Sequence, residues 1–353
     1  MTDEPRDGSG EAGPDPDPPG AARPADGPPG GDDSGTRHDG SHHDGSHQDG
    51  NCHDGSCHDR GRHGGTRHDA AHDDGPAASR LTGRAVVAER RLSAALAEVT
   101  LDGGQVVMVK RGDAPGAVRA EAAGLAWLAE ARAVRVPAVR GHDAHRLVID
   151  RVAEGRPDAR AALRFGRDLA ALHAAGAPAF GAPPPGGPEE AYIGRAPMRN
   201  VPGDDWPSWY AAHRVLPYLR RAVDEGVLRP AEAAEIEGVL ERLPDLAGPA
   251  EPPARLHGDL WNGNVLWGAD GRVWLIDPAA HGGHRETDLA MLRLFGCPHL
   301  DRVLAGYQEA APLADGWRDR IGLHQLFPLL VHAVLFGRGY AEQALAAARG
   351  APA

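Results

Sequence analysis

The chain has 353 residues, 41% of them hydrophobic, and a formal net charge of −12 at pH 7. It contains no apolar run of about 18 residues or more, so the sequence predicts no membrane-spanning helix, and residues 1–5 do not begin a secretion signal. Its three cysteines, Cys52, Cys57 and Cys297, are too few and too scattered for a disulfide framework, so we expect a cytoplasmic protein.

Residues 1–78 are predicted to form a disordered, acidic tail rich in His, Asp and Gly. They contain 17 acidic residues and six Arg, which leaves 33 acidic and 32 basic residues to the rest of the chain. That near-neutral remainder offers no basic surface for nucleic acid. Nine His in the tail, next to Asp and two Cys, could bind divalent metals weakly, but their spacing defines no closed four-ligand site. We therefore favour a solvated extension.

Residues 79–152 are predicted to form a small lobe with an antiparallel sheet and one main helix. Strand-like segments occur at 85–87, 97–101, 105–110, 134–139 and 145–150, with a turn signal at 102–104. Lys110 ends the third strand, and Glu121 opens an amphipathic helix that could bring its carboxylate to Lys110. The turn between the first two strands contains Ser93 but no Gly. The backbone from Asp150 to Val152 leads out of the lobe, and we expect it to hydrogen-bond the edge of the adenine of a nucleotide.

Residues 153–353 are predicted to form a larger, mostly helical lobe. Helices are expected at about 159–175, 206–225, 230–242, 286–294, 300–310 and 317–348, and the Pro- and Gly-rich range 177–188 is expected to be a loop. His173, in the first of these helices, is interpreted as a packed or capping residue. Cys297 is interpreted as a thiol of the core.

The range 256–266 is the most informative part of the sequence, because it places polar residues at a defined spacing between apolar flanks. It reads His257-Gly-Asp259-x-x-x-x-Asn264. The protein-kinase catalytic loop has the form His-Arg-Asp-x-x-x-x-Asn, in which Asp accepts the proton of the attacking hydroxyl and Asn binds magnesium. Asp277 follows an apolar strand 13 residues after Asn264, where kinases place a second metal-binding carboxylate. Each residue alone could cap a turn, but the three together predict a kinase site.

A dense polar segment follows Asp277 and enters a helix. Glu286 and Asp288 suit the first turn of that helix, and Asp288 could hydrogen-bond the backbone of the loop that carries Asp259. His284 and Arg285 could instead contact a substrate or a phosphate.

Several of these segments together resemble the fructosamine (ketosamine) kinase family, which is related to aminoglycoside and choline kinases. The matching segments are 257–264, 276–279, 283–291 and 294–296, and the likeness extends over about residues 80–340. The resemblance implies a two-lobed, protein-kinase-like α+β fold, with residues 79–152 as the nucleotide-binding lobe and residues 153–353 as the catalytic and substrate-binding lobe. It also implies ATP-dependent phosphorylation of the 3-hydroxyl of a ketosamine, the adduct formed when a reducing sugar glycates an amine or a protein. This reaction is linked to deglycation.

The resemblance also implies roles for individual residues. Asp259 would be the catalytic base, and Asn264 and Asp277 would bind Mg²⁺. Lys110 would bind the phosphates of ATP, oriented by Glu121. The remaining assignments are Ser93, Asp150 and Val152 for ATP, Trp261, His284, Arg285 and Glu286 for the substrate, and His257 and Asp288 for structural support of the site.

Two other functions remain open at this point. An aminoglycoside or choline kinase would share the same catalytic core. A pseudokinase that handles metals through its tail is the non-enzymatic alternative, although the intact Lys110, Asp259, Asn264 and Asp277 argue against it.

Overall fold

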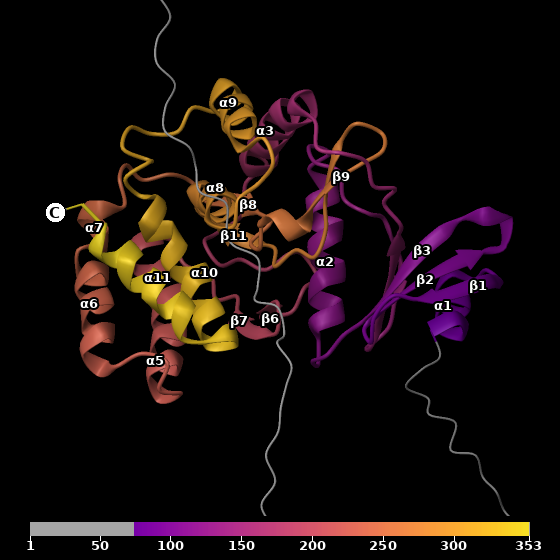
Figure 1. The fold of residues 1–353 in the computed structure, drawn as a ribbon, viewed down its shortest axis with the longest axis horizontal. Coiled ribbons are helices and arrows are strands. Elements are labelled where there is room, and N and C mark those ends of the chain that lie inside the picture. Colours follow the sequence, from indigo (N-terminus) through magenta and orange to yellow (C-terminus); the bar gives the residue numbers. More distant parts are fainter. Residues whose placement is uncertain (1–73, 353) are drawn as a thin grey trace, which may run out of the picture. The chain divides into compact units, whose positions relative to one another are not determined.

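The computed structural model of the protein describes residues 74–352. Most of the predicted tail, including its nine His, therefore lies outside the described residues. None of the helices within 74–352 is both long enough and apolar enough to cross a membrane. Figure 1 shows a small sheet with two helices and a larger, mostly helical region.

The smaller lobe is built on a five-stranded antiparallel sheet in the order β1-β2-β3-β5-β4. The strands are β1 (Val86–Arg91), β2 (Leu96–Leu101), β3 (Val106–Arg111), β4 (Val139–His142) and β5 (Arg146–Asp150). Their apolar residues alternate between two faces, so each face can carry one hydrophobic cluster. Helix α1 (Asp74–Thr82) packs on the face that contains Val107 and Val109, and α2 (Ala117–Glu130) packs on the face that contains Leu147 and Ile149.

Two details of this lobe correct the sequence prediction. Helix α1 begins at Asp74, inside the range 1–78 that we expected to be tail, because Ala78 is buried against the sheet and Asp74 pairs with Arg111 at 2.8 Å. The expected strand at 134–139 is instead β4, at Val139–His142. Pro137 has no N–H to donate to a strand ladder, so it does not suit the interior of a sheet.

The larger lobe consists of helices around two hydrophobic clusters. Its helices are α3 (Ala159–Ala174), α4 (Trp206–Tyr210), α5 (Leu216–Asp224), α6 (Pro230–Glu241), α7 (Leu243–Leu246), α8 (Arg285–Leu294), α9 (Leu300–Ala310), α10 (Ile321–Phe336) and α11 (Arg338–Arg349). A π-helical turn, η3 (Ala211–Val215), joins α4 to α5. The single helix expected over 317–348 is divided at Gly337, whose φ of +94° a helix cannot accommodate.

Three two-stranded antiparallel pairs complete this lobe. They are β6 (Glu190–Ile193) with β7 (Ala196–Arg199), β8 (Ala254–Leu256) with β11 (His281–Gly283), and β9 (Val265–Trp267) with β10 (Val273–Leu275). The β6–β7 hairpin was not predicted from the sequence. The β9–β10 hairpin lies between β8 and β11 in the chain. The pairing of β8 with β11 therefore brings the loop after β8 and the loop after β10 to the same place.

Candidate active site

The loop between β8 and β9 positions Asp259 through a glycine that no other residue could replace. Gly258 has φ +82°, and a Cβ at this position would lie 2.1 Å from the carbonyl oxygen of Ala279. The loop then closes through η4 (Asn262–Asn264), which precedes β9. Glycine is thus required both by the left-handed backbone and by the close approach of the neighbouring chain.

Asp259 and Asn264 contact each other directly, as the spacing predicted. Asn264 Nδ2 donates to the Asp259 carboxylate at 3.1 Å and to the Asp259 carbonyl at 2.8 Å. Because Nδ2 is used in this way, the amide oxygen of Asn264 is left to face elsewhere. Burial is the main cause that raises the pKa of Asp259 to about 7, and the nearby carboxylates of Asp277 and Asp288 act in the same direction.

Lys110 joins the two lobes at this site. Its Nζ lies 2.5 Å from Glu121 Oε1 and 2.7 Å from Asp277 Oδ1. Burial by itself lowers the pKa of Lys110, but the two carboxylates outweigh burial and raise it, so the amine remains protonated. Asp277 itself has φ +55°, an uncommon conformation for a non-glycine residue, which directs its carboxylate to Lys110. The predicted ion pair of Lys110 with Glu121 is therefore present.

These residues line one cavity of about 380 Å³. The predicted site residues in its wall are Lys110, Glu121, Asp259, Trp261, Asn264 and Asp277. Trp261 is 38% exposed, and its ring covers Gly263, where a Cβ would lie 2.2 Å from the indole. These predicted residues thus bring a cation, three carboxylates, an amide and an aromatic face to the cavity wall.

Asp288 makes the predicted hydrogen bonds to the backbone of the loop that carries Asp259. Its carboxylate accepts hydrogen bonds from the backbone N–H of His257 at 2.8 Å and of Gly258 at 3.0 Å. It also lies 3.2 Å from His173 Nε2, and His173 Nδ1 lies 2.8 Å from the Tyr307 hydroxyl. This buried carboxylate therefore ties the loop to α3 and α9 as well as to its own helix, α8.

His257 supports the loop as a neutral imidazole. Its Nε2 lies 2.9 Å from the carbonyl of Ile276, which can only accept, so Nε2 carries the proton. Nδ1 is then free to accept the N–H of Asp259 at 3.3 Å. Burial lowers the pKa of His257 and keeps the ring uncharged. His257 therefore gives the structural support that we predicted, because it connects the segment before Asp259 to the segment before Asp277.

Three predicted ATP-binding residues lie outside this cavity wall. Ser93 is exposed, and its hydroxyl accepts the N–H of Ala95 at 3.2 Å within its own turn. The Asp150 carboxylate pairs with Arg140 at 2.5 Å, so it is used within the sheet. The expected adenine contact involves the backbone from Asp150 to Val152, which leaves the sheet at the end of β5, and it stays a prediction.

The predicted substrate contacts of His284, Arg285 and Glu286 do not fit their positions. Glu286 is buried and pairs with Arg320 at 2.6 Å, and Arg285 pairs with Glu251 at 2.6 Å. The ring of His284 caps α8 by accepting the N–H of Glu286 at 3.3 Å. Arg285 and Glu286 are satisfied by partners far away in the sequence, and His284 by the first turn of its own helix, so the three side chains stabilise the helical lobe instead of lining the cavity.

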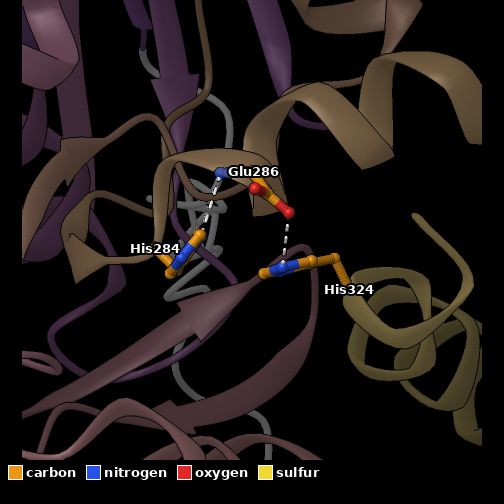
Figure 2. Close-up of side chains that lie close together, drawn as sticks. All are labelled: His284, Glu286 and His324. Carbon is orange, nitrogen blue, oxygen red and sulfur yellow. Dashed lines mark hydrogen bonds and ion pairs between the residues drawn. The ribbon is translucent and has the colours of Figure 1, made fainter. Parts of the chain in front are cut away.

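Figure 2 shows that His284, Glu286 and His324 gather into one buried group. Their candidate ligand atoms lie within 4.8 Å of one another, a separation that a metal ion could in principle bridge. However, Arg320 donates to both oxygens of Glu286, at 3.0 and 2.6 Å, and already neutralises it. A divalent cation would add uncompensated buried charge next to a guanidinium, so we interpret the group as a structural network.

Sequence reasoning gave no role to several residues that complete the cavity wall. They include Tyr192, Asn200, His332 and Phe336. Tyr192 and Asn200 lie within the range 80–340 over which the family resemblance extends, and that resemblance was the only signal available for them. His332 and Phe336 reach the cavity from α10, and an apolar helix of this kind looks like ordinary core in a sequence.

The oxygen atoms of Asn264 and Asp277 fit a Mg²⁺ ion. An amide oxygen and a carboxylate are the hard ligands that Mg²⁺ prefers, and it usually takes only one or two of them from the protein. The hydrogen bonds of Asn264 Nδ2 to Asp259 turn the amide so that its oxygen is the end left for a ligand. The side chain of Asp277 is 43% exposed, so a ligand in the cavity can reach it.

The comparison with known proteins decides the family. The family model for fructosamine kinase matches residues 93–349. The chain belongs to the fructosamine kinase family. A probable ketoamine kinase of Synechocystis is 34% identical to it over 251 residues, which cover 69% of this chain and 82% of that protein. A probable ketoamine kinase of Thermus thermophilus is 35% identical over 238 residues, covering 67% and 82%.

A solved structure supports the same family assignment. A candidate fructosamine-3-kinase from Thermobifida fusca YX-ER1 is 52% identical, has a TM-score of 0.74 and covers 79% of this chain and 98% of its own. The two-lobed, protein-kinase-like fold is therefore confirmed, and so is the prediction of a kinase that phosphorylates a hydroxyl group. The aminoglycoside, choline and pseudokinase alternatives are not favoured.

Proposed function

We propose that this fructosamine kinase family member transfers the γ-phosphoryl group of ATP to the 3-hydroxyl of a ketosamine. The observation that carries the proposal is the convergence of Lys110, Asp259, Asn264 and Asp277 on one cavity. These residues come from three different segments of the chain, and each has the chemistry that phosphoryl transfer requires at its position. The names of the similar proteins support the ketosamine as acceptor.

In this mechanism Asp259 accepts the proton of the attacking hydroxyl. A pKa near 7 makes its carboxylate a stronger base than an ordinary aspartate, while a large fraction remains ionised at neutral pH. Asn264 and Asp288 fix the position of Asp259, the first by direct contact and the second through the loop backbone. Positioning of this kind is the main contribution that a protein makes to phosphoryl transfer.

Lys110 supplies positive charge on the side of the nucleotide. Its Nζ would exchange part of its interaction with Glu121 and Asp277 for the phosphate oxygens of ATP. Bound Mg²⁺ would neutralise charge that develops on the γ-phosphate, and Asn264 and Asp277 would hold it. Glu121 keeps Lys110 at the end of its strand. Lys110 lowers the pKa of Glu121, but burial has the larger effect and raises it.

Trp261 would form a platform for the sugar. Its indole lies at the cavity wall next to Asp259 in the loop, and an aromatic face suits the apolar side of a sugar ring.

The acceptor would be a free ketosamine or a glycated protein, and phosphorylation at the 3-position would lead to deglycation.

The test is an ATP-consumption assay with Mg²⁺ and a panel of acceptors: a ribulosamine, a fructosamine, an aminoglycoside and choline. We expect turnover on a ketosamine, and we expect Asp259→Asn to reduce kcat by about 10²–10⁴-fold with little change in the KM for ATP. Asp204→Asn removes an exposed carboxylate before α4 and serves as the control. Turnover on only the aminoglycoside or choline would refute the proposed acceptor, and near-normal turnover by Asp259→Asn would refute the proposed base.

A further inference from the structure

Asn200 is a polar side chain in the cavity wall whose amide nitrogen has no partner among the described residues. It follows β7, is fully buried, and lines the same cavity as Asp259. Its Oδ1 accepts a hydrogen bond from Arg214 Nη2 at 2.8 Å. A guanidinium can only donate, so the amide oxygen must face Arg214 and the nitrogen must face away. Within residues 74–352, Nδ2 has no hydrogen-bond partner.

Arg214 is a buried cation whose hydrogen bonds within residues 74–352 go to neutral acceptors. Besides Asn200, these acceptors are the carbonyls of Arg199 at 2.9 Å and of His213 at 3.2 Å. Its guanidinium lies over the ring of Trp209, 4.6 Å from the centroid. It is carried by the π-helical turn η3, and π-helical turns are rare and frequent at functional sites. A buried cation is costly to keep, so its retention next to the cavity requires a reason.

The arrangement makes the unpartnered end of Asn200 a strong donor. In a low-dielectric interior, a hydrogen bond from a charged group polarises the group that accepts it. The charge of Arg214 therefore draws electron density toward Oδ1 and makes the N–H groups of Nδ2 more acidic. Such a donor suits an oxygen atom of a ligand, and it suits an ammonium group poorly.

We propose that Asn200, oriented and polarised by Arg214, positions the phosphoryl acceptor by donating a hydrogen bond from Nδ2 to one of its oxygens. This proposal rests on the proposed function, because a ketosamine presents several hydroxyl and carbonyl oxygens to the cavity wall. In an amino alcohol with one oxygen, the contact would fall on the attacking oxygen itself and reduce its nucleophilicity. Asn200 thereby favours polyhydroxylated acceptors over simple amino alcohols.

Two substitutions test the role of Asn200. Asn200→Asp has nearly the same size and can pair with Arg214, but it replaces the donor by an acceptor, and Asn200→Ala removes both. We expect each variant to raise the KM for the acceptor by about tenfold, while the KM for ATP stays within about twofold. Tyr218→Phe is the matched control, since the Tyr218 hydroxyl donates to Pro197 of β7 at 2.6 Å but does not line the cavity.

A series of deoxy acceptors separates direct contact from a structural effect. For the one oxygen that Asn200 binds, the increase in KM caused by removing the oxygen and the increase caused by truncating Asn200 should not add on a free-energy scale. For every other oxygen of the acceptor, the two increases should add. An acceptor KM within twofold of wild type in both variants would overturn the proposal, as would additivity at every position. If the wild-type enzyme turns over only an acceptor other than a ketosamine, the proposed function has failed. The role of Asn200 is then decided by the same deoxy series made on that acceptor. Turnover on no acceptor would refute both.

Discussion

Asp288→Asn should loosen the catalytic loop without touching the cavity. The carboxylate accepts from two backbone N–H groups, those of His257 and Gly258, and contacts His173 Nε2. An Asn presents one oxygen and one NH₂ to the same three groups. If the oxygen takes the place of Oδ2, the NH₂ faces the N–H of Gly258, and that buried donor loses its partner.

The cost follows from the interactions that are lost. A hydrogen bond to a charged group contributes about 1.5–3 kcal/mol, and an unsatisfied buried donor costs about 1–3 kcal/mol. Asp288→Asn should therefore reduce the free energy of unfolding by about 3–5 kcal/mol. For a chain of this size, that corresponds to a decrease in Tm of about 6–15 °C. Because Gly258 directly precedes Asp259, kcat should decrease at least about tenfold as the base loses its position.

Calorimetry and steady-state kinetics on the same preparation check this prediction. The KM for ATP should stay close to that of wild type, because the hydrogen bonds of Asp288 go to His257, Gly258 and His173 and not to Lys110, Glu121 or Asp277. Asp205→Asn is the control, since Asp205 caps α4 by accepting the N–H of Ser208 at 3.0 Å and Asn caps a helix equally well. A Tm within about 2 °C of wild type together with an unchanged kcat would refute the reasoning.

Two further predictions concern the same loop. Gly258→Ala should abolish turnover and lower Tm by several degrees, because its Cβ would lie 2.1 Å from the Ala279 carbonyl at a φ of +82°; a folded variant with normal kcat would contradict the close approach. For the pH dependence, Asp259 acts as a base only when ionised, and burial raises its pKa to about 7. The kcat/KM for the acceptor should therefore decrease about tenfold per pH unit below 7 and level off above it, and a flat profile between pH 5.5 and 7 would argue against Asp259 as the base.

The contacts within the loop that carries Asp259 could be predicted from the sequence because they depend on short spacings. Asp259 and Asn264 are five positions apart, and the loop between them closes on itself through a direct hydrogen bond. The contact of Lys110 with Glu121 was also predictable, since a strand followed by a helix brings their ends together. The support of the loop by Asp288 was predicted from its place in the first turn of α8, and it is confirmed.

The misassigned residues show what local spacing cannot reveal. Arg285 and Glu286 stand next to the kinase motifs and are charged, so an exposed, ligand-binding position was a reasonable expectation. Their partners, Glu251 and Arg320, are 34 residues away in opposite directions, and only the packed structure brings them together. Once each charge is satisfied inside the protein, neither side chain is available to a substrate.

The two sides of the cavity, proposed for the nucleotide and for the acceptor, differ in how clearly the sequence indicates their residues. Phosphate and metal need a cation, carboxylates and an amide at fixed spacing, and the motifs around Lys110, Asp259 and Asp277 supply them. Apart from Trp261, the acceptor side is assembled from the β6–β7 hairpin, the residue after it and α10, whose residues form no catalytic motif by their spacing. There a functional residue can be recognised by a defect in the packing, such as a buried amide nitrogen without a partner among the described residues. Asn200 is such a residue, and its orientation follows from Arg214, which lies 14 positions further along the chain.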